Sequence, residues 1–95
     1  MEIKLLIKSL TMATQKQKEH AWETASPVKG KNPDLYRKDN YGNEIYKPSY
    51  GKQGAKSWEV DHKKPVAKGG SESLRNIQAL KTSVNREKSH KYPHK

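Results

Sequence analysis

The chain has no cysteine and no phenylalanine, and this limits how a fold of 95 residues can be held together. Without thiol groups, disulfides, thiolate zinc sites and cysteine nucleophiles are all excluded. Apolar residues make up only 31% of the sequence, against about half in an ordinary globular domain, so a large enzyme-like core is excluded too. We therefore expect at most one small domain, held together by two Trp, five Tyr and a few aliphatic side chains.

The charge of the chain is strongly positive, since 20 Lys and Arg against 10 Asp and Glu give a net charge of +10. This excess favours a polyanionic partner, most simply nucleic acid. Only three of the basic residues are Arg; Lys contacts phosphate as a point charge and rarely reads bases through paired hydrogen bonds. No segment approaches the apolar length of a membrane span or a signal peptide, so we expect no membrane partner and an intracellular, cytoplasmic location.

Residues 1–33 are predicted to form an N-terminal helical and linker extension. Gln, Lys, Glu, Ala and Trp favour a helix over residues 14–25, with Thr14 as the N-cap. The Pro and Gly residues of segment 26–33 predict a linker. The residues before Met12 differ in character from those after it, and one hypothesis is that translation starts at Met12 rather than at Met1.

Tyrosines dominate residues 35–50, where they flank a cluster of Asp, Asn and Gly at 39–43. This pattern predicts a β-hairpin with a turn of several residues. Tyrosines interleaved with basic residues could also stack on nucleic-acid bases. Because the chain has no Phe, we expect most of the tyrosines to serve the core.

The segment from Trp58 onward gives the sharpest pattern. Alternation predicts a strand over Trp58–His62, then an eleven-residue loop, a second strand at 77–80 and a helix from Thr82 to about residue 91. The core of this part is expected to contain Trp58, Leu74, Ile77, Leu80 and Val84. The fold class is therefore predicted to be α+β.

Four residues of this segment have the chemistry that phosphodiester hydrolysis requires: Asp61, His62, Asn76 and Asn85. A divalent cation that stabilises the phosphate prefers carboxylate and amide oxygens, and a neutral imidazole can take a proton from water. Neighbours on a strand point to opposite faces, so if Asp61 points toward the following helix, His62 points across the hairpin toward the loop. A helix that begins near Thr82 would bring Asn85 to face Asp61.

This order of residues resembles the HNH nuclease family, whose motif lies in a ββα-metal fold. The motif appears as WEVDHKKPVAKGGSESLRNIQALKTSVNREKSH, with 14 residues from His62 to Asn76 and nine from Asn76 to Asn85. The spacings are similar to those of the HNH domain of RNA-guided CRISPR effectors, in the Asp-His-Asn-Asn variant. The match covers residues 58–89, and residues 36–57 more loosely resemble the hairpin before the motif in small phage and bacterial members. The resemblance implies an HNH nuclease domain over residues 34–95.

The resemblance also implies a role for each motif residue. His62 would be the general base, Asp61 and Asn85 would hold one Mg²⁺ or Mn²⁺, and Asn76 would brace the loop and orient His62. Mg²⁺ is the expected cofactor, and Mn²⁺ or a transition metal is the alternative. His90 is a candidate additional ligand, but a basic tail is the favoured interpretation of the segment that carries it. DNA is the expected substrate, nicked to leave 5′-phosphate and 3′-hydroxyl ends. The basic residues expected to contact it are Arg86, Lys88, Lys63 and Lys68.

Two functions remain open at this point. The first is a metal-dependent DNA endonuclease, phage-encoded, that nicks or cuts both strands. The second is a non-catalytic basic nucleic-acid-binding or accessory module that has kept the HNH fold. A ribosome-associated RNA binder would explain the lysines but not the motif. Many small HNH proteins add zinc-binding cysteine pairs, so here the N-terminal helix and the hairpin, or a homodimer or larger protein partner, must supply the support.

Overall fold

The computed structural model describes residues 13–88. The alternative start at Met12, the last turn of the predicted C-terminal helix and His90 lie outside these residues. The described part has two α-helices and two antiparallel sheets, which confirms the α+β class. No helix within it is both long enough and apolar enough to cross a membrane. Its elements are α2 (Gln15–Thr24), β1 (Ser26–Pro27), β2 (Tyr36–Lys38), β3 (Glu44–Tyr46), β4 (Trp58–His62), β5 (Ile77–Lys81) and α3 (Thr82–Lys88), with short 3₁₀ turns at Lys47–Ser49, Val66–Lys68 and Leu74–Asn76.

The predicted N-terminal helix is confirmed as α2, and its start is set by local hydrogen bonds. Thr14 Oγ1 accepts from the backbone N–H of Gln17, and Gln17 Oε1 accepts from the backbone N–H of Thr14, both at 3.0 Å. This reciprocal capping box satisfies two amide groups that the first turn leaves unpaired. One face of the helix carries the buried residues Ala21 and Trp22.

The predicted hairpin is confirmed as β2 and β3, with Tyr36 opposite Tyr46 and Lys38 opposite Glu44. Asp39 closes the turn, because its Oδ1 accepts from two backbone amides of the turn at 2.9 Å. The linker prediction was wrong for residues 26–27, which form β1 at the edge of this sheet. Proline is tolerated there because an edge strand does not need every backbone N–H.

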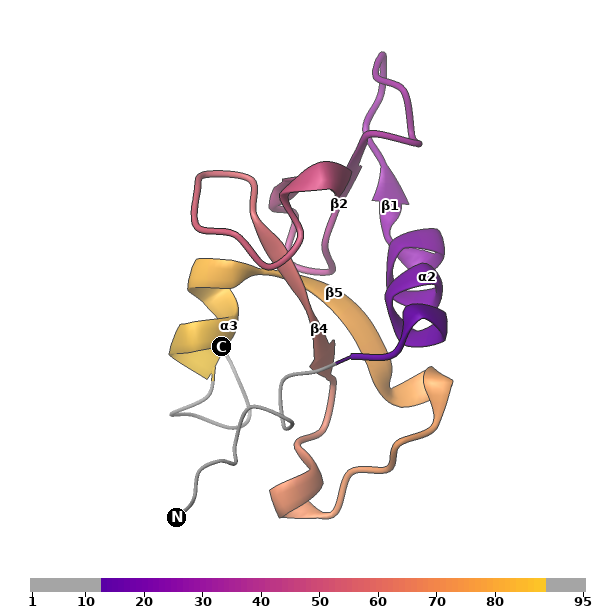
Figure 1. The fold of residues 1–95 in the computed structure, drawn as a ribbon, viewed down its shortest axis with the longest axis vertical. Helices are drawn as coiled ribbons and strands as arrows, with labels where there is room; N and C mark the ends of the chain where they lie inside the picture. Colours follow the sequence, from indigo (N-terminus) through magenta and orange to yellow (C-terminus); the bar gives the residue numbers. More distant parts are fainter. Residues whose placement is uncertain (1–12, 89–95) are drawn as a thin grey trace.

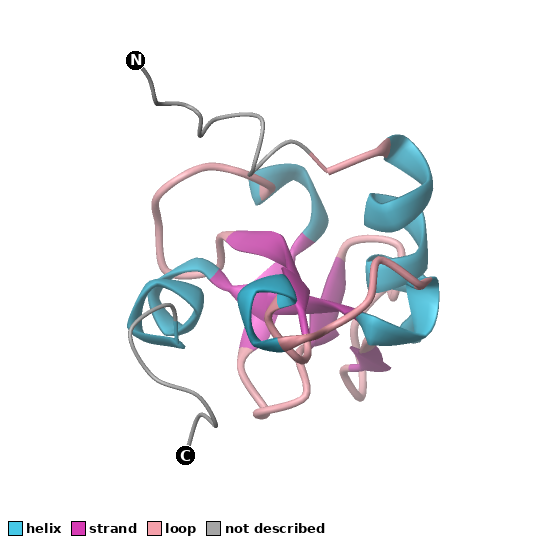
Figure 2. Cartoon of the chain, turned by 90° about the horizontal axis from the view of Figure 1, so that it is seen from below, coloured by secondary structure: helices cyan, strands magenta, loops and turns pink. Residues whose placement is uncertain are grey.

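The second sheet is the antiparallel pair β4 and β5, in which Trp58 lies opposite Lys81 and His62 opposite Ile77. Helix α2 contacts this hairpin, and α3 contacts it too (Figure 1). The view from below shows helices on either side of the strands (Figure 2). A candidate site at the ends of β4 is therefore supported by both helices.

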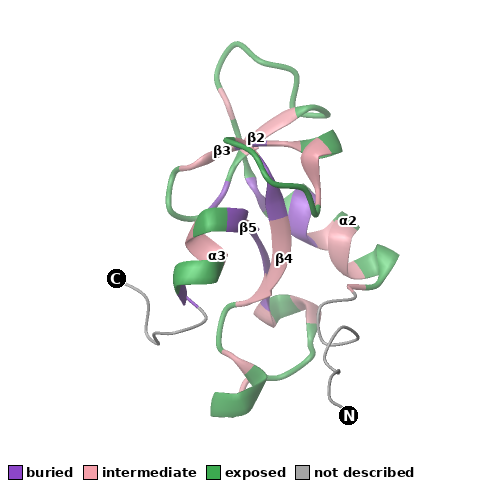
Figure 3. Ribbon diagram, turned by 60° about the vertical axis from the view of Figure 1, so that its left-hand side comes forward, coloured by how far each residue is buried: buried purple, intermediate pink, exposed green. Residues whose placement is uncertain are grey.

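The core joins the N-terminal helix to the second sheet. The rings of Trp22 and Trp58 lie 5.2 Å apart between centroids, and both residues are almost fully buried, so the expected role of Trp58 as a core anchor is confirmed. Burial concentrates on β5 and the inner face of α2 (Figure 3). Of the other expected core residues, Ile77 and Leu80 are fully buried, whereas Leu74 and Val84 are only partly buried.

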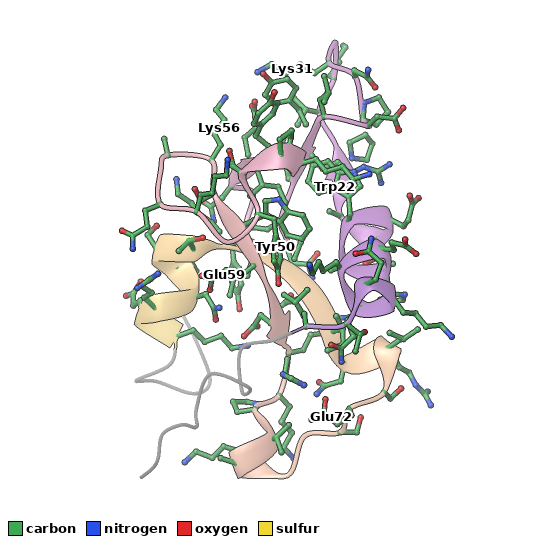
Figure 4. All side chains as sticks on the ribbon, viewed as in Figure 1. Trp22, Lys31, Tyr50, Lys56, Glu59 and Glu72 are labelled. Atoms are coloured by element: carbon green, nitrogen blue, oxygen red, sulfur yellow. The ribbon has the colours of Figure 1, made fainter. Side chains whose placement is uncertain are left out.

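A cluster of ion pairs joins two loops to the β2–β3 hairpin. Lys31 and Lys56 both place Nζ against Oε2 of Glu44, at 2.6 and 2.8 Å, and both ammonium groups lie over the ring of Tyr36. These two lysines come from separate loops (Figure 4). The hydrogen bonds from Lys31 and Lys56 lower the pKa of Glu44 to about 2.

Candidate active site

The end of β4 directs its last two side chains to different neighbours. Asp61 contacts Lys88 on α3, and His62 contacts Glu72 in the loop between β4 and β5. This is the division of directions predicted from the alternation of side chains along a strand. The side chain expected to bind a cation and the side chain expected to transfer a proton therefore leave the end of β4 in different directions.

His62 is held by a carboxylate that the sequence reasoning missed. Its Nε2 lies 2.8 Å from Oε1 of Glu72, and its side chain is 28% exposed. An ionised carboxylate can only accept hydrogen bonds, so Nε2 donates, and Nδ1 of the neutral ring keeps its lone pair. Glu72 lies in the long loop between β4 and β5, at the end of the molecule away from the β2–β3 hairpin (Figure 4). Its signal in the sequence was weak: one acidic residue ten positions after His62.

Asn76 fastens this loop to itself. Its Oδ1 accepts from the backbone N–H of Lys64 at 2.9 Å, and its Nδ2 donates to the carbonyls of Lys64 at 3.0 Å and Ser71 at 2.7 Å. Its own carbonyl accepts from the N–H of Lys63 at 2.7 Å. Gly70 packs so closely that a Cβ there would lie 1.8 Å from the carbonyl oxygen of Lys64. The loop that carries Glu72 is thus braced; a direct effect of Asn76 on His62 stays a prediction.

Asp61 is paired with a buried lysine. Lys88 Nζ lies 2.5 Å from Oδ2 of Asp61, and the side chains of Lys88 and Asp61 are only 4% and 12% exposed respectively. The same ammonium donates to the carbonyls of His62 at 2.7 Å and Lys63 at 3.1 Å. Lys88, expected from the sequence at the DNA surface, therefore lies inside the molecule against the end of β4.

Asn85 does not face Asp61 as expected. Its Nδ2 donates to Oε1 of Glu59 at 2.8 Å. Glu59 is two residues before Asp61 and so points to the same face of β4, between this strand and α3 (Figure 4). The face of α3 that was expected to meet Asp61 does meet β4, but its contacts are displaced along the strand.

Two side-chain amides connect the β2–β3 hairpin to Asp61 by hydrogen bonds. Asn40 Nδ2 donates to Oε1 of Gln78 at 2.8 Å, and Gln78 Nε2 donates to Oδ2 of Asp61 at 2.9 Å. The neighbouring Tyr41 is half exposed, and burial, together with the negative charges of Asp61 and Asp39, raises its pKa. The turn at 39–43 therefore forms one wall of the region around Asp61.

The donors around Asp61 fit a hard divalent cation. Among residues 13–88 there is no group of three or more His, Cys, Asp or Glu side chains arranged to hold a metal ion. The oxygens that the structure brings together there are the Asp61 carboxylate and the backbone carbonyls of His62 and Lys63, which suit Mg²⁺ or Mn²⁺ better than a soft metal. The contact with the Lys88 ammonium demonstrates that oxygens at this place already bind a cation.

Several basic side chains surround the loop and the helix. Lys63 and Lys68 are exposed, and Arg86 is 60% exposed, with Nη2 3.9 Å from Oε2 of Glu59. A shallow hollow of about 420 Å³ lies in the loop, and Lys64 and Arg75 line it together with glycines, serines and Asn76. Sequence reasoning missed Lys64 and Arg75 because only the folded loop brings them to one hollow.

Residues 50–91 match the family model described as HNH endonuclease, which confirms the family recognised from the motif. The segment 50–91, which contains all four motif residues, therefore belongs to the HNH endonuclease family, and this membership supports a nuclease-type activity in general. No curated protein and no solved structure gives a significant match to the chain.

Proposed function

We propose that the protein is a metal-dependent endonuclease that hydrolyses phosphodiester bonds of DNA. The observation that carries the proposal is the pairing of His62 with Glu72 inside the region that matches the HNH family. An imidazole whose Nε2 donates to a carboxylate keeps Nδ1 as a proton acceptor for water. Partial exposure of the ring leaves room for that water and for a phosphate.

In this proposal β4, β5 and α3 form the ββα-metal unit. Asp61 and Asn85 would hold one Mg²⁺ or Mn²⁺, which would supply positive charge to the phosphate and to the leaving oxygen. His62 Nδ1 would take the proton of the attacking water, while Glu72 keeps the ring oriented. Asn76 would act indirectly, by holding the loop from which Glu72 reaches His62.

DNA binding is proposed for the basic rim of the loop and the helix. Lys63, Lys68 and Arg86 are exposed and would contact backbone phosphates. The hollow lined by Lys64 and Arg75 adds two cations near the loop that carries Glu72. Few of these contacts can read bases, so cutting is proposed to have little sequence preference.

The nuclease unit is proposed to span residues 34–95, with the N-terminal extension as its support. Helix α2 buries Trp22 against Trp58 and so supplies apolar contacts to a domain without cysteine-bound zinc. One such site cuts one strand. A break in both strands would therefore require a homodimer or two successive binding events.

The second candidate is a non-catalytic DNA-binding module, and one observation favours it. Lys88 neutralises Asp61 and Asn85 pairs with Glu59, so both proposed metal ligands have partners within the protein. A module that binds DNA through charge alone would keep such pairs permanently. The two candidates differ in whether a metal ion changes what the protein does to DNA.

Nicking of a supercoiled plasmid separates them. Wild type and Asp61→Asn are incubated with plasmid in Mg²⁺, Mn²⁺ or EDTA, and the open-circular product is quantified. The nuclease proposal expects nicking by wild type in the two metals only, with loss of nicking in the variant at similar DNA affinity. Binding without nicking in every condition would refute the nuclease and support the module.

A further inference from the structure

Lys88 is bound in the manner of a metal ion. Lysine is almost never buried as deeply as 4% exposure unless its charge is compensated. Its ammonium has three donors, and three oxygens receive them: Asp61 Oδ2, the carbonyl of His62 and the carbonyl of Lys63. The cation thus comes from α3 and sits in an oxygen site at the end of β4.

These oxygens form the kind of site that hard cations occupy. One carboxylate and two carbonyls, completed by water, are ordinary ligands of Mg²⁺, Mn²⁺ and Ca²⁺. A metal ion bound about 2.0–2.6 Å from the Asp61 carboxylate would lie within a few ångströms of the ammonium. Two cations at that separation repel each other strongly in a site with little water. The ammonium and a divalent ion therefore exclude each other.

We propose that Lys88 is a tethered cation that fills this oxygen site in the metal-free protein, and that a divalent ion binds at Asp61 only by displacing it. The inference deepens the proposed function, since it concerns the metal site that a nuclease would use. Lys88 keeps the nearly buried Asp61 carboxylate compensated when no metal is present, which avoids the cost of an unpaired buried charge. The metal must break three hydrogen bonds of the ammonium, so the tether weakens metal binding. The displaced side chain would then be available for the phosphate contact expected from the sequence.

Displacement can be followed in the wild-type protein without any substitution. Lysines are acetylated briefly in the presence or absence of Mn²⁺, and the modification of each lysine is measured by mass spectrometry, with bound Mn²⁺ monitored by electron paramagnetic resonance. Acetylation of Lys88 is expected to rise several-fold when Mn²⁺ is bound, while the exposed Lys68 stays unchanged. Bound Mn²⁺ with unchanged acetylation of Lys88 would overturn the proposal.

Metal affinity gives the second test. Lys88→Met keeps a side chain of similar length and removes the charge. Mn²⁺ should therefore bind this variant at least about tenfold more tightly than wild type, a gain in the range of ordinary coupling between sites. Without metal this variant should melt at a lower temperature than wild type, and Mn²⁺ should restore most of the loss. The matched control Lys81→Met, on the neighbouring strand β5, should leave Mn²⁺ affinity unchanged.

The double variant Asp61→Asn with Lys88→Met removes both charges. It is expected to melt above Lys88→Met in the absence of metal and to lose the response to Mn²⁺. Equal Mn²⁺ affinity of wild type and Lys88→Met, or no binding by either, would refute the inference. These measurements contain no DNA, so displacement without plasmid nicking would refute only the nuclease, and nicking without displacement would refute only the tethered cation.

Discussion

Replacement of Asn76 by alanine should loosen the loop that holds Glu72. The side chain makes three hydrogen bonds to the loop backbone, of 2.9, 3.0 and 2.7 Å. Each contributes about 0.5–1.5 kcal/mol net, and water can replace part of that here because the loop is partly exposed. Taking about 0.5–0.8 kcal/mol for each of the three bonds, near the lower end of the range, we expect Asn76→Ala to cost about 1.5–2.5 kcal/mol of unfolding free energy. In a domain of this size the melting temperature should fall by about 6–20 °C.

Thermal unfolding followed by circular dichroism measures this change, and plasmid nicking measures its effect on the site. Nicking by Asn76→Ala should slow even at temperatures where the protein is folded, because Glu72 no longer holds His62. The control is Asn32→Ala, which removes one exposed hydrogen bond, from the N–H of Asp34 at 2.9 Å, and should cost about 0.5–1 kcal/mol. A melting temperature of Asn76→Ala equal to that of this control would refute the bracing role.

Three further predictions concern charge and packing. The pKa of Glu44 is lowered from 4.5 to about 2 in the folded state, so its ionised carboxylate stabilises the fold fully above pH 4.5, and this contribution is lost as the pH falls toward 2. In Glu44→Gln the melting temperature should therefore fall less over that pH window than in wild type. Trp22→Ala should cost about 3–5 kcal/mol in urea unfolding, a large share of the stability of a small domain, and a loss below about 1 kcal/mol would contradict its place in the core. Replacing Lys64 and Arg75 together by serine should lower the slope of log Kd against log salt for duplex DNA by about 1.8. The control Lys29→Ser, at the far end of the molecule, should leave the slope unchanged. A slope of the double variant equal to that of wild type would show that the hollow is not part of the DNA-binding surface.

The elements that local sequence determines were predictable. The start of α2 follows from a threonine and a glutamine three residues apart, and the hairpin turn follows from an aspartate that caps its own backbone. The two-residue strand β1 was not predictable, because Ser26 and Pro27 become a strand only by pairing with β2. Its existence depends on a partner about ten residues away rather than on its own residues.

The sequence was enough to predict that one face of β4 would meet one face of α3, but not which residues of the two faces would pair. Glu59 and Asp61 share one face of β4, and Asn85 and Lys88 share one face of α3. The sequence does not determine how far α3 is displaced along β4. Glu59 and Asp61 lie about 6.6 Å apart along the strand, and Asn85 and Lys88 lie about 4.5 Å apart along the helix axis. Sliding α3 along β4 by about this distance therefore changes the partner of Asp61 from Asn85 to Lys88. That shift pairs Asn85 with Glu59 and leaves Lys88 opposite Asp61.

The ratio of cutting to binding decides whether His62 is the base of a nuclease. The nicking rate constant and the DNA dissociation constant are measured in the same metal-containing buffer for wild type, His62→Ala and His20→Ala, the last being a histidine of α2 with no proposed role. We predict that His62→Ala lowers the rate constant by about 10²–10⁴-fold with nearly unchanged affinity, while His20→Ala resembles wild type. A rate constant of His62→Ala equal to that of wild type would show that His62 is not the base.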